Sequence, residues 1–159
     1  MSSESAVIHS QLIATQSRSL LLPNTAIAEI VRYTEPQPAA DPAPDWLLGT
    51  MVWRGLRIPV VSYERASGEA VAEYDSSARI AVLNAVHSGA ALQFYAIVIR
   101  HNPRLLKVLR DDIRKESGAD REKFQLQQVV VKDITATIPD LAAFEQLISS
   151  AGFQTERVH

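Results

Sequence analysis

The stretch from residue 46 to residue 61, WLLGTMVWRGLRIPVV, constrains the fold of this chain more than any other part of the sequence. It is almost wholly apolar, but Arg54 and Gly55 interrupt it near the middle. Two apolar runs of strand length that are joined by two residues are typical of a β-hairpin, because the tight turn needs a positive φ, which glycine adopts without strain. We therefore predict a hairpin with Arg54 and Gly55 at its tip.

One face of this predicted hairpin is apolar along its whole length. With the turn at Arg54 and Gly55, Trp53 stands opposite Leu56, and the alternation continues away from the tip on the same side. A face without polar side chains belongs in a core. The predicted core residues on it are Met51, Trp53, Leu56, Ile58 and Val60.

The other face is mixed, which is expected of a surface that meets solvent or a partner. It pairs Val52 with Arg57, Thr50 with Pro59, and Leu48 with Val61. Because proline cannot donate to a strand ladder, we expect Pro59 at a sheet edge or a bulge, and Gly49 permits another part of the chain to approach closely. An arginine beside a tryptophan has the composition of an interface hot spot, so the tip is a candidate contact surface, with a merely solvated turn as the alternative.

The rest of the chain alternates short β-rich segments with turn signals. Residues 34–45 hold four prolines and predict an extended connection, and the charged run 111–123 predicts a solvated loop or frayed helix. One helix is expected over residues 139–152, with Pro139 in its first turn. Many short strands and one terminal helix predict a mainly β fold of barrel type. The expected strands lie in 6–22 (a pair), 27–33 (after a short turn), 78–86, 91–99, 104–109 and 125–138.

Composition narrows the function. A net charge of −2 argues against nucleic acid as the main ligand, although a small barrel with Trp53, Arg54 and Arg57 could bind a single strand, so this alternative stays open. The chain has no cysteine, no signal-peptide pattern and no apolar run of the roughly 20 residues that cross a bilayer, so we expect a cytoplasmic protein without membrane insertion.

Enzymatic chemistry finds no support in the sequence. The four histidines lie in four separate segments, and no nucleophile elbow, phosphate-binding glycine loop or dinucleotide-binding motif occurs. The adjacent carboxylates Asp111 and Asp112 fall in a run of mixed charge, where a surface position is the simpler interpretation. We predict no catalytic residue, no metal site and no cofactor.

Four segments together resemble the CheW family of chemotaxis adaptors: IAEIVRY, a proline-bearing gap, PDWLLGTMVWRGLRIPVV and RIAVLNAV, within roughly residues 7–85. The resemblance implies two five-stranded SH3-like barrels packed side by side, with a closing C-terminal helix. It implies a single domain over residues 6–152 made of two intertwined barrels, a flexible N-terminus over 1–5 and a flexible tail over 153–159. The matching positions are Pro44, Trp46, Leu47, Gly49, Arg54, Gly55, Ile58, Pro59 and Val60.

The same resemblance implies a non-enzymatic adaptor that couples chemoreceptor cytoplasmic tips to the regulatory domain of a CheA-type histidine kinase. Such a protein is cytoplasmic and joins membrane receptor arrays through its partners. A protein that caps an array by binding one partner is the alternative. Ser62-Tyr63 and the run QFYAIVIRHNPRLLKVL depart from the family pattern and imply a divergent member, such as one serving pilus motility or another accessory pathway. The implied partner-binding residues are Ile27, Glu29, Trp46, Gly49, Arg54, Gly55 and Arg57.

Overall fold

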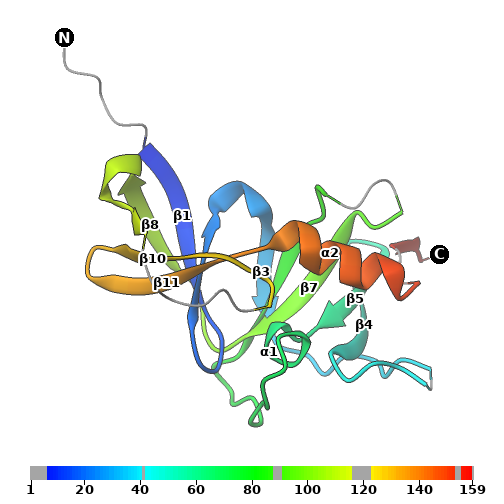
Figure 1. Ribbon diagram of the computed structural model, residues 1–159. Helices are drawn as coiled ribbons and strands as arrows, with labels where there is room; N and C mark the ends of the chain where they lie inside the picture. Colours follow the sequence, from blue (N-terminus) through cyan, green and yellow to red (C-terminus); the bar gives the residue numbers. More distant parts are fainter. Residues whose placement is uncertain (1–6, 41, 88–90, 116–122, 153–154, 159) are drawn as a thin grey trace.

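The computed structural model describes residues 7–40, 42–87, 91–115, 123–152 and 155–158. Within them the chain forms two β-sheets that lie against each other, and a helix packs beside their junction (Figure 1). This arrangement confirms the predicted mainly β fold with a C-terminal helix.

The first sheet combines the two N-terminal strands with strands from the second half of the chain. Its strand order is β8-β1-β2-β11-β10-β9, and the N-terminal hairpin β1–β2 is enclosed by strands from the second half of the sequence. Val7 of β1 pairs with Leu109 of β8, and Leu20 of β2 pairs with Thr137 of β11, so both outer sides of this hairpin meet strands from far along the sequence. The strands are β1 (Val7–Ala14), β2 (Ser19–Pro23), β8 (Arg104–Leu109), β9 (Arg114–Lys115), β10 (Gln125–Val131) and β11 (Ile134–Pro139).

The second sheet is built from the middle of the chain. Its order is β12-β5-β7-β6-β3, with β4 paired to β5, and the final strand β12 is the one element contributed by the C-terminus. Among the described residues, each sheet has five strands of at least five residues and one strand of two residues, in keeping with the predicted five-stranded barrels. The strands are β3 (Ile27–Arg32), β4 (Leu47–Trp53), β5 (Leu56–Val61), β6 (Arg79–Asn84), β7 (Phe94–Ile99) and β12 (Glu156–Arg157).

Three apolar clusters hold the molecule together. One fills the first barrel around Val108 and Val129, and another fills the second barrel around Ile58 and Val82. The largest lies between the barrels, where side chains of both sheets meet Phe144 from the helix. Each fully buried side chain of this kind contributes about 1.5–3 kcal/mol through its removal from water, so the inter-barrel cluster joins the two sheets into one folding unit.

The C-terminal helix α2 spans Leu141–Ser150 and begins two residues later than the pattern predicts. Asp140 is its N-cap, and its side chain accepts a hydrogen bond from the backbone N–H of Ala143 at 3.1 Å. The prediction that Pro139 lies in the first turn of the helix is therefore wrong. Pro139 ends β11, where it pairs with Gln125. An aspartate side chain that accepts one of the free N–H groups at a helix start favours a boundary at this residue.

The short segments between the strands agree in most places with expectation. A 3-10 turn, η1 (Asn24–Ala26), leads into β3, and a second, η2 (Arg110–Asp112), follows β8. A single helical turn, α1 (Tyr63–Ala66), follows β5. The expected flexible N-terminus 1–5 and residues 116–122 of the charged run lie outside the described residues.

Over residues 155–158, the structure differs from the flexible tail expected for residues 153–159. These residues lie against the domain, and Glu156–Arg157 among them form β12, which pairs with β5. The predicted domain limits at residues 6 and 152 remain predictions, and the paired tail places ordered chain beyond the second of them.

Candidate functional site

The β4–β5 hairpin has the register that the sequence predicts near its tip. Trp53 pairs with Leu56, Met51 with Ile58 and Gly49 with Val60. Both turn residues have positive φ, 48° at Arg54 and 76° at Gly55, as a two-residue hairpin loop with the twist of its strands requires. Arg54 thus takes a conformation that costs about 1–3 kcal/mol for a residue other than glycine, and such strain is concentrated at functional sites.

At the base of the hairpin, a bulge at Leu48 makes the observed register differ from the predicted one. The pairing shifts between Leu47 and Gly49, so Leu47 and not Leu48 stands opposite Val61. An extra residue in one strand turns the side chains that follow to the other face. As a result Leu47 and Val61 lie in the cluster between the barrels, and the mixed face is exposed only near the tip.

Pro59 lies neither on an edge strand nor at the bulge, the two positions expected for it, but at a gap in the pairing of β5. It is buried in β5, a strand with neighbours on both sides. On the side away from β4, residues 56 and 57 pair with β12 and residues 60 and 61 pair with β7. Pro59 falls between these two partners, where a missing N–H interrupts neither ladder.

Gly49 has a structural reason to be glycine. The backbone of Gln37, from the proline-bearing connection, exchanges two hydrogen bonds of 2.9 Å with Thr50. This brings the Gln37 carbonyl oxygen so close that a Cβ on Gly49 would lie 2.0 Å from it, at a φ of 145°. The close approach expected at Gly49 is therefore made by the chain itself.

The tip of the hairpin is organised around the carboxylate of Glu29. The Nε1 of Trp53 donates to Glu29 Oε1 at 2.8 Å, and Arg54 Nη2 lies 3.2 Å from the same oxygen. The Arg54 guanidinium also lies over the Trp53 ring, 4.7 Å from its centroid, and Phe94 packs against that ring at 4.9 Å. One carboxylate oxygen thus connects β3 to the end of β4 and to the turn.

This polar cluster faces solvent. The side chains of Arg54 and Glu29 are 66% and 40% exposed, whereas Trp53 is 7% exposed. An exposed ion pair contributes about 0–1 kcal/mol to folding, and an arginine over an aromatic ring contributes about as much. The cluster therefore orients a charged group at the surface without adding much to the stability of the domain.

The predicted partner-binding residues divide into an exposed and an enclosed group. Glu29, Arg54 and Gly55 come together at the surface, and Arg57 follows on β5, with its Nη1 donating to the Gln37 side chain at 3.0 Å. Ile27 is half-buried at the start of β3.

Trp46 and Gly49 are buried, so they shape the hairpin from within, and their predicted contact with a partner stays a prediction. All five predicted core residues lie in or against the cluster of the second barrel.

The first sheet carries an exposed apolar strip that was not predicted from the sequence. Val7 of β1 pairs with Leu109 of β8, and Leu105 is 74% exposed on the same face of β8. The alternation in the run RLLKVL could have predicted this strip. It places Leu106 and Val108 in the core, and it places on the other side Leu105, Lys107 and Leu109.

A buried carboxylate also escaped prediction. Glu64 of α1 is 1% exposed, and its Oε2 accepts a bond of 3.3 Å from the backbone N–H of Gln16, while its Oε1 has no hydrogen-bond partner. Desolvation raises the pKa of Glu64 above its usual value, although backbone hydrogen bonds and the nearby Arg100 charge oppose this rise. Nothing in the local sequence distinguishes it from a surface glutamate.

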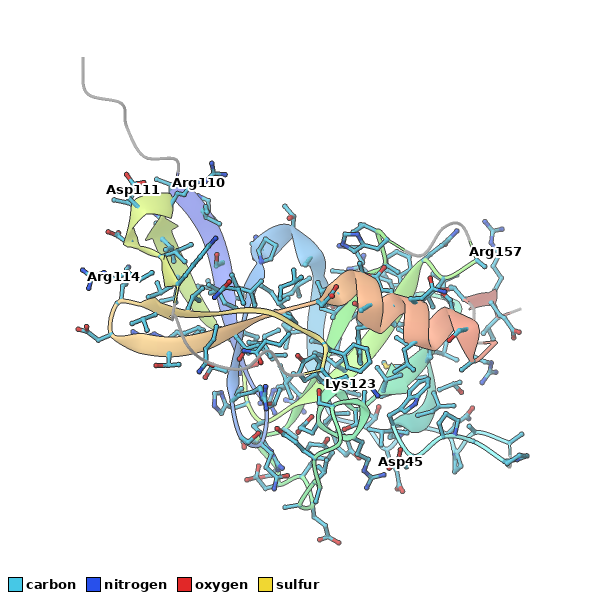
Figure 2. All side chains as sticks on the ribbon, in the orientation of Figure 1. Asp45, Arg110, Asp111, Arg114, Lys123 and Arg157 are labelled. Carbon is cyan, nitrogen blue, oxygen red and sulfur yellow. The ribbon has the colours of Figure 1, made fainter. Side chains whose placement is uncertain are left out.

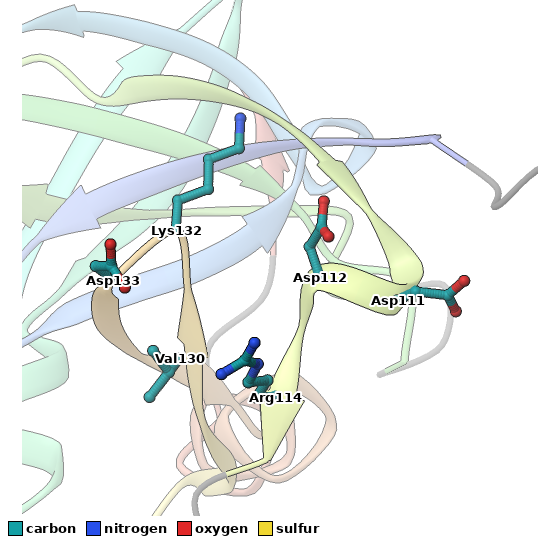
Figure 3. Close-up of a pocket in the computed structure, with 6 residues that line it drawn as sticks. All are labelled: Asp111, Asp112, Arg114, Val130, Lys132 and Asp133. Atoms are coloured by element: carbon teal, nitrogen blue, oxygen red, sulfur yellow. The ribbon is translucent and has the colours of Figure 1, made fainter.

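A hollow of about 330 Å³ lies at the far end of the first barrel (Figure 3). Lys132 and Asp133 reach it from the turn between β10 and β11, and Asp112 and Arg114 face them from the segment after β8. Three carboxylates and two cations share it, which agrees with the surface position expected for Asp111 and Asp112. No group of three potential metal ligands occurs among the described residues, and none of the described helices has the length and apolarity to span a bilayer.

The two packed β-barrels, the closing helix and an exposed hairpin tip define a module of two β-barrels. Residues 12–148 match the family model for the CheW-like domain, and the chain belongs to the CheW-like domain family. A search of curated proteins gives no match.

Among solved structures, the fold is similar to the crystal structure of scaffolding protein TtCheW from Thermoanaerobacter tengcongensis. The TM-score is 0.71 at 13% sequence identity, over 84% of this chain and 89% of that one. At this low identity, the comparison shows that the two chains share a fold and shows nothing further.

Proposed function

We propose that this protein is a non-enzymatic adaptor of a bacterial chemosensory pathway, which couples chemoreceptor cytoplasmic tips to the regulatory domain of a CheA-type histidine kinase. It would act in the cytoplasm, at receptor arrays. Membership of the CheW-like domain family and the fold shared with a scaffolding protein support this proposal.

The observation that carries the proposal is the strained arginine at the hairpin tip. Arg54 holds a φ of 48°, where glycine or asparagine would be less strained, and its ion pair with Glu29 is too exposed to compensate fully. Folding therefore gains little from an arginine at this position. A planar, charged group presented on a rigid turn beside Trp53 suits recognition of another protein.

Binding measurements with purified partners test this role. The probes are a cytoplasmic fragment of a chemoreceptor and the regulatory domain of a CheA-type kinase, both from the source genome. Arg54→Ala should weaken binding of at least one of them by about 1–4 kcal/mol, as loss of a hot-spot arginine does, while the melting temperature stays near wild type. Arg110→Ala is the matched control, because Arg110 is an exposed arginine at the opposite end of the molecule (Figure 2).

The outcomes separate the adaptor from its alternatives. Full affinity in Arg54→Ala would remove the hairpin tip from the contact surface. Formation of a ternary complex with receptor and kinase would favour a bridging adaptor, whereas mutually exclusive binding would favour a protein that caps arrays. Absence of binding to either probe would refute the adaptor role.

A further inference from the structure

The last described residues of the chain lie beside the hairpin tip. In β12, Glu156 pairs with Arg57 and Arg157 pairs with Leu56. The backbone N–H of Val158 then donates to the carbonyl oxygen of Gly55 at 2.8 Å. The C-terminal segment 155–158 therefore continues the sheet along β5 as far as the turn itself.

Thr155 fixes the start of this segment. Its backbone N–H donates to the Ala91 carbonyl at 3.0 Å. Its Oγ1 accepts from the backbone N–H groups of Gln93 and Phe94 at 3.1 and 3.2 Å, and lies 3.3 Å from the Phe94 carbonyl. Phe94 is the residue whose ring packs on Trp53, so the anchor lies directly beside the polar cluster at the tip.

The outer half of β5 depends on this segment for its second neighbour. Strand β4 pairs with β5 along its full length, but β7 pairs with it at Val60 and Val61. Without β12, the part of the hairpin nearest the turn would be a two-stranded ribbon among the described residues, and such a ribbon is marginally stable in water. A third strand restricts its twist and position.

The turn is consequently held from two sides. On the β4 side, the carboxylate of Glu29 binds Trp53 and Arg54. On the β5 side, Val158 binds the carbonyl of Gly55, the residue that follows Arg54. The Arg54–Glu29 ion pair is solvent-exposed and weak, so the backbone bond from the tail is well placed to fix the direction in which Arg54 points.

We propose that residues 155–158 are positioning residues of the partner-binding surface: they hold the Arg54–Gly55 turn in the conformation that a partner recognises. This inference rests on the proposed function for the identity of the partner, but the hold on the turn is a property of the free protein. The side chains of Glu156, Arg157 and Val158 are exposed, and Arg157 projects at the end of the molecule opposite Arg110 (Figure 2). The segment thus acts through its backbone and contributes little to the cores.

A proline at residue 158 removes the donor and leaves the rest of the tail in place. We expect Val158→Pro to shift the amide resonance of Gly55 and the indole resonance of Trp53 in ¹H–¹⁵N spectra, with an unchanged indole resonance of Trp46 as the internal reference. Val158→Ala keeps the N–H and is the matched control. Thr155→Val, which removes the Oγ1 bonds, should give the same spectral change if the proline variant folds poorly. Resonances of Gly55 and Trp53 that stay at their wild-type positions in both Val158→Pro and Thr155→Val would overturn the proposal.

Affinity for the receptor fragment and the kinase domain supplies the second arm. Val158→Pro should weaken binding about fivefold to tenfold in the wild-type background and leave it unchanged in an Arg54→Ala background, because neighbouring groups that act as a unit are not additive. Equal losses in both backgrounds would refute a role through Arg54. If wild type binds neither probe while the Trp53 and Gly55 resonances still move, the proposed function and with it the partner-binding role fail, and the hold of the tail on the turn stands.

Discussion

The base and the tip of the β4–β5 hairpin are a few residues apart, but the base is buried and the tip is exposed and strained. At the base, Leu47 and Val61 are enclosed between the barrels, and Gly49 lies beneath the backbone of Gln37. At the tip, Arg54 is two-thirds exposed in a strained turn, with contacts that add little stability. One hairpin therefore carries both a folding role and a surface role, and the two should respond differently to substitution.

Trp53 lies at the boundary between the two regions and should give the largest effect. Its ring is buried on the core face, so Trp53→Ala should lower the free energy of unfolding by roughly 3–5 kcal/mol, through lost burial and the cavity that remains. Urea unfolding followed by circular dichroism measures this. A variant as stable as wild type would mean that the indole contributes nothing to the core and would erase the distinction between base and tip.

The two glycines of the hairpin offer a direct comparison. Gly49→Ala places a Cβ 2.0 Å from the Gln37 carbonyl oxygen, so the Gln37–Thr50 bridge must move, at a cost of about 1–3 kcal/mol. Gly55→Ala meets open space and suffers only from its positive φ, at a cost of about 1 kcal/mol. Thermal melts of the two variants check the order. A larger loss at Gly55 would show that the turn, and not the base, limits stability.

Charge divides the regions in the same way. Glu64 of α1 is buried, and desolvation raises its pKa, while the Glu29 side chain at the tip is 40% exposed. Because the folded protein binds the Glu64 proton more tightly than the unfolded chain, this group stabilises the fold at low pH, and that contribution is lost as pH rises through its raised pKa. Glu64→Gln should therefore match wild type in acid and become the more stable protein towards neutral pH. Parallel pH profiles of the two would refute the burial argument.

The smallest effect is expected at the turn. Arg54→Asn should raise the free energy of unfolding by a few tenths of a kcal/mol to about 1 kcal/mol, because asparagine tolerates positive φ better than arginine. The same variant should lose partner affinity. A gain in stability with retained binding would show that the strain at Arg54 serves no partner.

The sequence predicted the tip better than the base. Gly55 and the alternation around it are local signals, and they set the register from Gly49 to Val60 correctly. The bulge at Leu48 has no local signal, and it decides which side chains of the base are enclosed. The burial of Trp46 and the pairing of β12 depend on partners far along the chain, in α2 and β5, so no local pattern contains them.

The position of Glu29 illustrates the same limit for the site. The family resemblance selected this residue, but its shared contact with Trp53 and Arg54 arises only when β3 and β4 are brought together.

The interleaved topology of the two sheets bears on how the protein emerges from the ribosome. Strands β3 to β7 are contiguous, so the second barrel has these strands available once residue 99 has been translated. The hairpin β1–β2, although synthesised first, must wait for β8 and β11 before either of its edges is covered. The Gly55 carbonyl beside Arg54 accepts its hydrogen bond from residue 158, so this contact at the hairpin tip forms only after the strands of both barrels have been translated.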